Sequence, residues 1–123
     1  MDEMTTDLHE LWATQWHLQT QSFNRDPTTL DPVARKHWMA QMLFGITDEV
    51  HEAAEHVAWK EHADGTHFDR EAFGEELTDV LLYLVALYVS AGWTPEDVTV
   101  AYDRKAKIVA HRQALGYEGR RTR

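Results

Sequence analysis

The chain of 123 residues contains no cysteine, so disulfide bonds and thiolate metal sites are excluded. It also lacks a convincing strand pattern and an internal repeat. Its longest apolar run, Val80 to Val89, is too short to span a bilayer. The acidic start of the chain, residues 1–10, lacks the apolar segment of a signal peptide. We therefore expect a single domain in a reducing cytoplasm, with no membrane partner.

Basic residues are scarce in most of the chain, which carries a net charge of −9. From Arg104 onward there are seven Lys and Arg against one acid, Glu118, whereas the preceding residues hold five Lys and Arg and twenty acids. An acidic body repels phosphate backbones, so no stable nucleic-acid binding is expected. Acids beside a short basic segment suit a metal ion and a phosphorylated small molecule. A solvated acidic surface with a basic tail is the alternative.

Helix signals divide the chain into four segments. Asp31 and Asp69 are suitable N-caps, and Thr94 precedes a proline at a first helical position. Gly92 and Gly116 are suitable residues just past a helix C-terminus. The sequence thus predicts an all-α fold, with helices over residues 6–23, 32–62, 70–91 and 95–116.

The third predicted helix is apolar on every side, because each residue from Val80 to Val89 is apolar or tyrosine. Such a helix must be surrounded by other helices, and three partners from one chain are too few to enclose it. We therefore expect a homo-oligomer with this helix at its centre. The second helix has a narrower apolar stripe, predicted to face the core, made of Met39, Met42, Leu43, Ile46, Val50, Ala53 and Val57.

Two pairs of acids stand beside these apolar positions: Glu49 with Glu52, and Glu76 with Asp79. Residues three apart lie on nearly the same face of a helix, so each pair can converge on one point. If the two helices pack antiparallel, four carboxylates surround one cavity. Oxygen ligands suit Mg²⁺, with Mn²⁺ as the alternative, and mutual repulsion makes a cation necessary. The alternative is that the pairs simply solvate two helix faces.

Four motifs together are similar to a known family. The acid pairs, 23 residues apart, resemble the metal signature of MazG-type all-α nucleotide pyrophosphohydrolases. The run Glu49-x-x-Glu52-x-x-Glu55-x-x-x-Trp59-Lys60 resembles their dimeric dUTPase branch. So do the C-terminal stretch from Lys105 through Arg112-Gln113-x-x-Gly116-Tyr117 and the early Gln15-x-x-Leu18-Gln19. The resemblance covers about residues 11–117.

This resemblance implies a four-helix bundle completed by oligomerisation, a dimer or a tetramer, with a catalytic domain over residues 1–117 and a basic tail over residues 118–123. It implies Mg²⁺-dependent cleavage of a (deoxy)nucleoside triphosphate, dUTP or a related pyrimidine, to the monophosphate and pyrophosphate. The implied residues are Glu49 and Glu52 for catalysis; Glu49, Glu52, Glu76 and Asp79 for the metal; Lys105 and Arg112 for phosphate; and Gln15, Gln19, Trp59, Lys60 and Tyr117 for the substrate.

The chain departs from the family pattern at two places, where Gln19 and Val109 stand in place of asparagines. If those asparagines select and orient the nucleotide, specificity for dUTP is affected while the metal chemistry is not. Two further hypotheses therefore stay open. One is a broad-specificity house-cleaning pyrophosphatase, and the other is a catalytically silent helical oligomer that serves as a scaffold.

Overall fold

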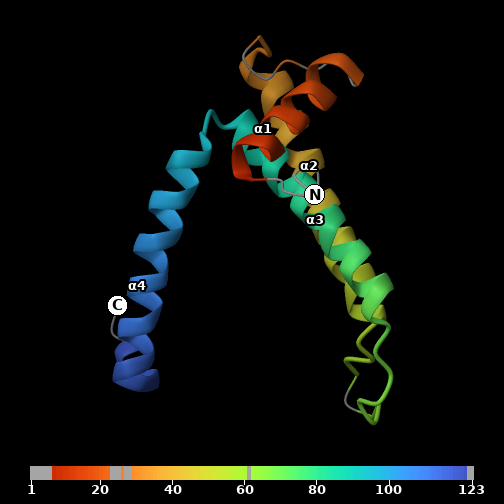
Figure 1. The fold of residues 1–123 in the computed structure, drawn as a ribbon, viewed down its shortest axis with the longest axis vertical. Coiled ribbons are helices and arrows are strands. Elements are labelled where there is room, and N and C mark those ends of the chain that lie inside the picture. The colour runs from red at the N-terminus through yellow and green to blue at the C-terminus, as the bar shows by residue number, and fades with distance from the viewer. Residues whose placement is uncertain (1–6, 23–25, 27–28, 61, 122–123) are drawn as a thin grey trace. The chain divides into compact units, whose positions relative to one another are not determined.

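The computed structural model describes residues 7–22, 26, 29–60 and 62–121, and describes side chains as far as Gly116. Within these ranges the chain is helical and contains no strand, which confirms the all-α prediction. The elements, in order, are α1 (Leu8–His17), the π-helical turn η2 (Leu18–Ser22), α2 (Pro32–Glu55), α3 (Arg70–Ser90) and α4 (Pro95–Arg121) (Figure 1).

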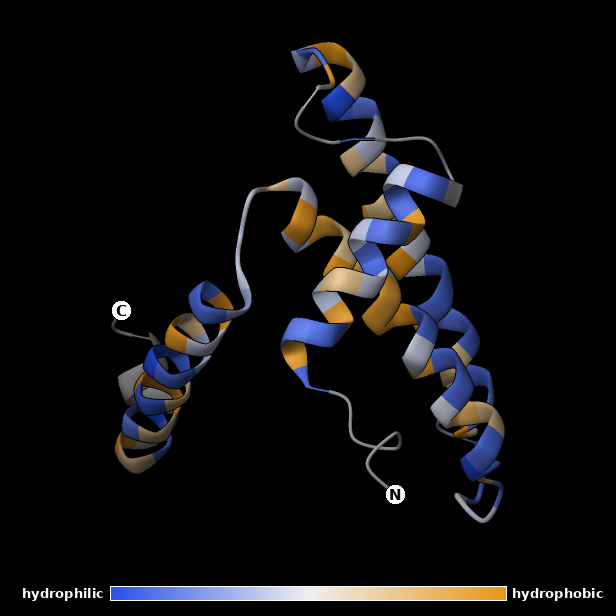
Figure 2. Ribbon diagram, turned by 45° about the horizontal axis from the view of Figure 1, so that its top comes forward, coloured by the Kyte–Doolittle hydropathy of each residue, from blue (hydrophilic) through white to orange (hydrophobic). Residues whose placement is uncertain are grey.

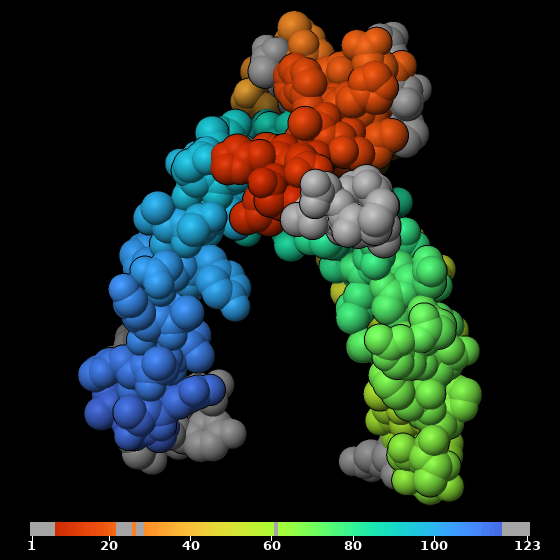
Figure 3. Space-filling view, in the orientation of Figure 1, coloured from red at the N-terminus to blue at the C-terminus, as the bar shows by residue number. Residues whose placement is uncertain are grey.

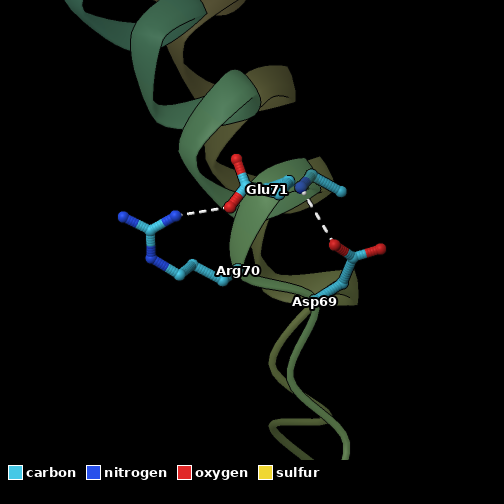
Figure 4. Close-up of polar contacts among 4 residues, drawn as sticks. Asp69, Arg70 and Glu71 are labelled. Atoms are coloured by element: carbon cyan, nitrogen blue, oxygen red, sulfur yellow. Dashed lines mark hydrogen bonds and ion pairs between the residues drawn. The ribbon is translucent and has the colours of Figure 1, made fainter.

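The start of α3 shows how locally the helix boundaries are determined. The Asp69 side chain accepts a hydrogen bond of 3.1 Å from the backbone N–H of Ala72, which would otherwise have no partner inside the helix (Figure 4). Next to it, Arg70 forms an ion pair with Glu71, an acid in the first turn of the helix. The predicted helix start is confirmed.

The other two predicted caps are also confirmed. Asp31 accepts from the backbone N–H of Ala34 at 2.8 Å, and a proline occupies the first position of α2. At α4 the bonds are reciprocal, because the Thr94 hydroxyl accepts from the Asp97 N–H and the Asp97 carboxylate accepts from the Thr94 N–H. These caps satisfy backbone donors from residues within three positions, so short sequence patterns suffice to predict them.

The end of α2 differs from the prediction. The helix ends at Glu55 instead of continuing to His62. Its last turn tightens as the His56 N–H bonds to the Ala53 carbonyl, and Ala58 then takes a left-handed conformation with φ of 53°. A left-handed residue at a helix end is usually glycine, and an alanine there gives no sequence signal for the stop.

The remaining boundaries are mixed. The predicted first-helix ends, Thr6 and Phe23, lie outside the described residues. Gly92 is left-handed after α3, as predicted. Gly116 breaks α4 with φ of 73° and ψ of −167°, but the chain resumes helical geometry to Arg121, so the expected tail is helical over its first residues.

None of the described helices alone is long and apolar enough to cross a membrane; α3 and α4 pass that test only as a pair broken at residues 91–94.

The chain forms two compact units, residues 1–92 and residues 93–123, and each is described here by itself. In the first unit α2 packs along α3, and α1 packs on α3. The ring of Trp12 on α1 stacks on Tyr88 of α3 with centroids 5.9 Å apart. The second unit is α4.

The first unit leaves much apolar surface uncovered. Its fully buried apolar side chains among the described residues are Ala53, Val85 and Ala86 alone. Leu43 remains 56% exposed, although it was expected to face the core, and Leu81 of α3 remains 44% exposed. Figure 2 shows apolar residues in orange along the helices, and Figure 3 shows the atoms of the first half of α3, in green, at the surface of the face drawn.

Candidate functional site

The site lies along the seam where α2 and α3 face each other. Three contacts show that the helices are antiparallel: Trp38 Nε1 donates to Ser90 Oγ at 2.8 Å, Tyr83 lies against Gly45, and Glu49 meets Glu76 and Asp79. Positions separated by three and four residues share one helix face. The seam is formed on α2 by Trp38, Met42, Gly45 and Glu49, and on α3 by Glu76, Asp79, Tyr83, Ala86 and Ser90.

Three of the four predicted carboxylates converge at this seam. One oxygen each from Glu49, Glu76 and Asp79 lies within 4.8 Å of the others. Glu49 and Glu76 are half-buried, and Glu49 Oε2 is fully buried with no hydrogen-bond partner. A buried, unpaired carboxylate oxygen is costly, because its hydration is lost without compensation. The donor set therefore suits a hard cation with oxygen ligands.

The surroundings of Glu49 in the cluster change its acidity. Its pKa is raised to about 7, first because Glu49 shares a hydrogen bond with Glu76, then because burial disfavours its charged form. The charges of Glu52, Asp79 and Glu76 raise this pKa further. Without a cation, the Glu49 carboxyl therefore holds a proton over part of the neutral range. A cation that binds there competes with that proton.

Glu52 does not belong to the group of three. Its side chain is exposed, and it affects the cluster through its charge on Glu49. It lies one helical turn from Glu49, beside the cluster and in contact with solvent. Such a carboxylate is placed to act on a water molecule more readily than to serve as a buried ligand.

A pocket of about 420 Å³ opens beside the cluster, within the first unit. Its volume falls in the range of small-molecule sites, about 300–1,000 Å³. Carboxylates stand at one end and mainly apolar side chains with one amide at the other. The lining residues are Gln15, Leu18, Trp38, Met42, Glu49, Asp79, Leu82, Tyr83 and Ala86. A ligand with a charged end and a flat, largely apolar end fits this division.

The two predicted glutamines have different positions. Gln15 lines the pocket, whereas Gln19 is fully buried at 0% exposure and is not among the lining residues. Gln15 Nε2 donates to Gln19 Oε1 at 2.9 Å, and Gln19 Nε2 has no partner. Of the two glutamines predicted to bind substrate, only Gln15 therefore lines the pocket.

The other predicted substrate residues are not gathered at the pocket. Trp59 and Lys60 follow the end of α2 as exposed residues and do not line it. Lys105 and Arg112 belong to the second unit, seven residues apart on α4. The side chain of Tyr117 lies outside the described part of the chain.

The sequence did not identify the apolar walls as part of a site. The available signal was the spacing along each helix. Met42 and Trp38 precede Glu49 by seven and eleven positions, so they lie on the same face of α2 as Glu49. Tyr83 and Ala86 follow Asp79 by four and seven positions, so they lie on the same face of α3 as Asp79. Extending the carboxylate face along both helices finds Trp38, Met42, Tyr83 and Ala86.

Comparisons of the chain with family models, with curated proteins and with solved structures gave no match. The functional argument therefore rests on the motifs and on the geometry of this seam.

The raised pKa of Glu49 predicts how stability depends on pH without a cation. Below about pH 4.5 the group is protonated in both the folded and the unfolded chain; above that pH the unfolded chain loses the proton first. Stability contributed by Glu49 should therefore fall as the pH rises through about 7. Urea unfolding in EDTA from pH 4.5 to 8 should show this loss, and Glu49→Gln should remove it.

Glu75→Gln is the matched control, since Glu75 is exposed on α3 and does not belong to the cluster of Glu49, Glu76 and Asp79. That variant should keep the pH slope of the parent protein. An identical slope in Glu49→Gln and in the parent protein would show that Glu49 carries no shifted proton.

Proposed function

We propose that the chain is a divalent-cation-dependent nucleoside triphosphate pyrophosphohydrolase, which cleaves between the α- and β-phosphates. The observation that carries this proposal is the convergence of Glu49, Glu76 and Asp79 at the charged end of a largely apolar pocket. A nucleoside triphosphate has the matching division, because its phosphates need a cation and its base needs an apolar cleft. The motif resemblance supports the same reaction independently of the pocket.

Mg²⁺ suits the three carboxylates, and Mn²⁺ is the alternative, since both prefer oxygen ligands. When bound, the cation supplies charge neutralisation on the phosphate oxygens. Glu49, Glu76 and Asp79 would hold it, and the unpaired Glu49 Oε2 would be available as a ligand. Protein carboxylates alone would repel a triphosphate, so the substrate and the cation are expected to bind together.

Water is the nucleophile in this proposal. Glu52, exposed beside the cluster, orients the water and accepts its proton, with Glu49 as the alternative base. The water oxygen forms a bond to the α-phosphorus while the bond from that phosphorus to the bridging oxygen breaks. The products are a nucleoside monophosphate and pyrophosphate. Lys105 and Arg112, on one face of α4, are proposed to bind the β- and γ-phosphates.

The base is proposed to occupy the apolar end of the pocket, against Trp38, Met42 and Leu18, with the Gln15 amide at its edge. The dUTPase-like motifs favour a pyrimidine deoxynucleotide such as dUTP. One observation favours an enzyme of broader specificity. Gln15 is the only amide side chain among the lining residues, so the pocket has few hydrogen-bonding groups that could distinguish one base from another. A house-cleaning enzyme acting on several triphosphates is therefore the second candidate.

We also propose that the active form is a homo-oligomer. Four exposed apolar residues each directly follow a seam residue in the sequence: Leu43, Val50, Leu77 and Leu84. One residue corresponds to a rotation of about 100°. Because α2 and α3 are antiparallel, this rotation brings both exposed stripes to the same side of the pair. The result is one apolar surface, and a second copy would present an identical surface to it.

The activity is tested with a panel of ribo- and deoxynucleoside triphosphates and Mg²⁺, reading monophosphate and pyrophosphate. Glu49→Gln and Asp79→Asn should each lower turnover by at least about 100-fold, because each removes a charge from the cation site. Glu75→Gln, the exposed neighbour, should remain close to the parent protein. Release of a diphosphate and inorganic phosphate, or normal turnover in both site variants, would contradict the proposal.

The assembly is tested by light scattering at micromolar concentration. The mass should be at least twice the 14.3 kDa of one chain, and a charge in the apolar surface, Leu43→Glu or Leu81→Glu, should lower it. Val100→Glu is the control, because Val100 is an exposed apolar residue of α4, 69% exposed. A parent protein of 14.3 kDa would contradict the proposed assembly.

A further inference from the structure

Gly45 of α2 lies directly against the Tyr83 ring of α3. A Cβ atom built on this residue would lie 2.7 Å from both Cε1 and Cζ of Tyr83. Carbon atoms in contact are normally about 3.5–4.0 Å apart, so the Tyr83 ring occupies space that any other residue at position 45 would fill. Glycine at this helical position lets the ring lie against the α2 backbone.

Tyr83 also lines the pocket, at a defined position along the seam between α2 and α3. Along α3 it lies one turn beyond Asp79 and one turn before Ala86; along α2, Gly45 lies one turn before Glu49 and one turn after Met42. The ring therefore stands between the carboxylate end and the apolar end. A ligand that reaches from one end to the other must pass it.

We propose that Tyr83 is a specificity-determining residue that contacts the sugar of the nucleotide, and that Gly45 positions its ring. This inference rests on the proposed function, because it assumes phosphates at the carboxylate end and a base at the apolar end. The sugar joins these two parts in every nucleotide. It is therefore the part that lies at the level of Tyr83.

The chemistry of the ring gives the direction of selection. The face of the ring is apolar and offers no conventional acceptor to a hydroxyl group. The phenolic oxygen, which can donate and accept, is attached to Cζ, one of the atoms that lie against Gly45. A ribose 2′-hydroxyl pressed against the face of the ring loses its hydrogen bonds to water without replacement, whereas a 2′-deoxyribose loses nothing there. A pocket of this kind rejects an added hydroxyl by up to about 100-fold. The site should therefore select 2′-deoxyribonucleotides.

Gly45 determines how far the ring stands from the sugar. In Gly45→Ala the new methyl group overlaps the ring, so Tyr83 has to shift. If it shifts into the pocket, the space for any sugar is reduced. Replacing the ring by a smaller side chain removes this overlap, so the effects of substitutions at the two positions must be coupled.

The experiment compares kcat/KM for the deoxyribo and ribo forms of the base that the parent protein hydrolyses fastest. The parent protein should favour the deoxyribo form by about 10- to 100-fold. Tyr83→Phe should keep this ratio, because the ring is retained. Tyr83→Leu should lower it by about tenfold, mainly through a lower KM for the ribo form.

The second arm tests the role of Gly45. Gly45→Ala should lower kcat/KM for both sugars, and the same substitution made in Tyr83→Leu should have little effect. Gly74→Ala is the matched control, since this glycine also lies in a helix but has nothing within 4 Å of its would-be Cβ. It should leave both kcat/KM values unchanged. Melting temperatures of all variants identify any that have merely lost stability.

The outcomes separate the two proposals. If the parent protein hydrolyses no triphosphate, the proposed function fails and this inference fails with it. If it hydrolyses both sugar forms equally, or if Tyr83→Leu stays folded and active with an unchanged ratio, the inference about Tyr83 is wrong while the proposed function stands. Independent effects of the Gly45 and Tyr83 substitutions would contradict the positioning role of Gly45.

Discussion

Mutual repulsion of three carboxylates across the α2–α3 seam is the constraint on which the rest of the first unit depends. Glu49, Glu76 and Asp79 are held with oxygens within 4.8 Å, although their charges disfavour that approach. Folding is opposed at this point unless a proton or a cation is bound, and the raised pKa of Glu49, to about 7, is the direct sign of that opposition. A protein rarely retains such a cost without a function for it.

Contacts farther along the seam hold the helices together against this repulsion. The Trp38–Ser90 hydrogen bond fixes the far end, and the Tyr83 ring packed on Gly45 holds the middle at close distance. These contacts also form the pocket walls, so one set of interactions both opposes the repulsion and shapes the ligand site. The large exposed apolar surface on the other side of the pair explains why a second copy is expected to complete the structure.

The parts of this structure that sequence predicts best are those determined by neighbouring residues. The caps at Asp31, Asp69 and Thr94 follow from side chains bonding within three positions, and the spacing of the acids places Glu49, Glu76 and Asp79 on facing helices. Sequence fails where tertiary packing decides. The stop of α2 coincides with a left-handed alanine, and the stripe of α2 predicted as core is partly exposed. Gln19 is fully buried, in the π-helical turn that follows α1.

The central claim is that this seam binds a cation in place of a proton. Calorimetric titration of the cation-free protein with Mg²⁺ or Mn²⁺ at pH 6.5, in two buffers of different ionisation enthalpy, measures cation binding and proton release together. The account predicts saturable binding that releases most of one proton per site, and loss of that release in Glu49→Gln. Absence of binding, or binding with an enthalpy that does not depend on the buffer, would contradict it.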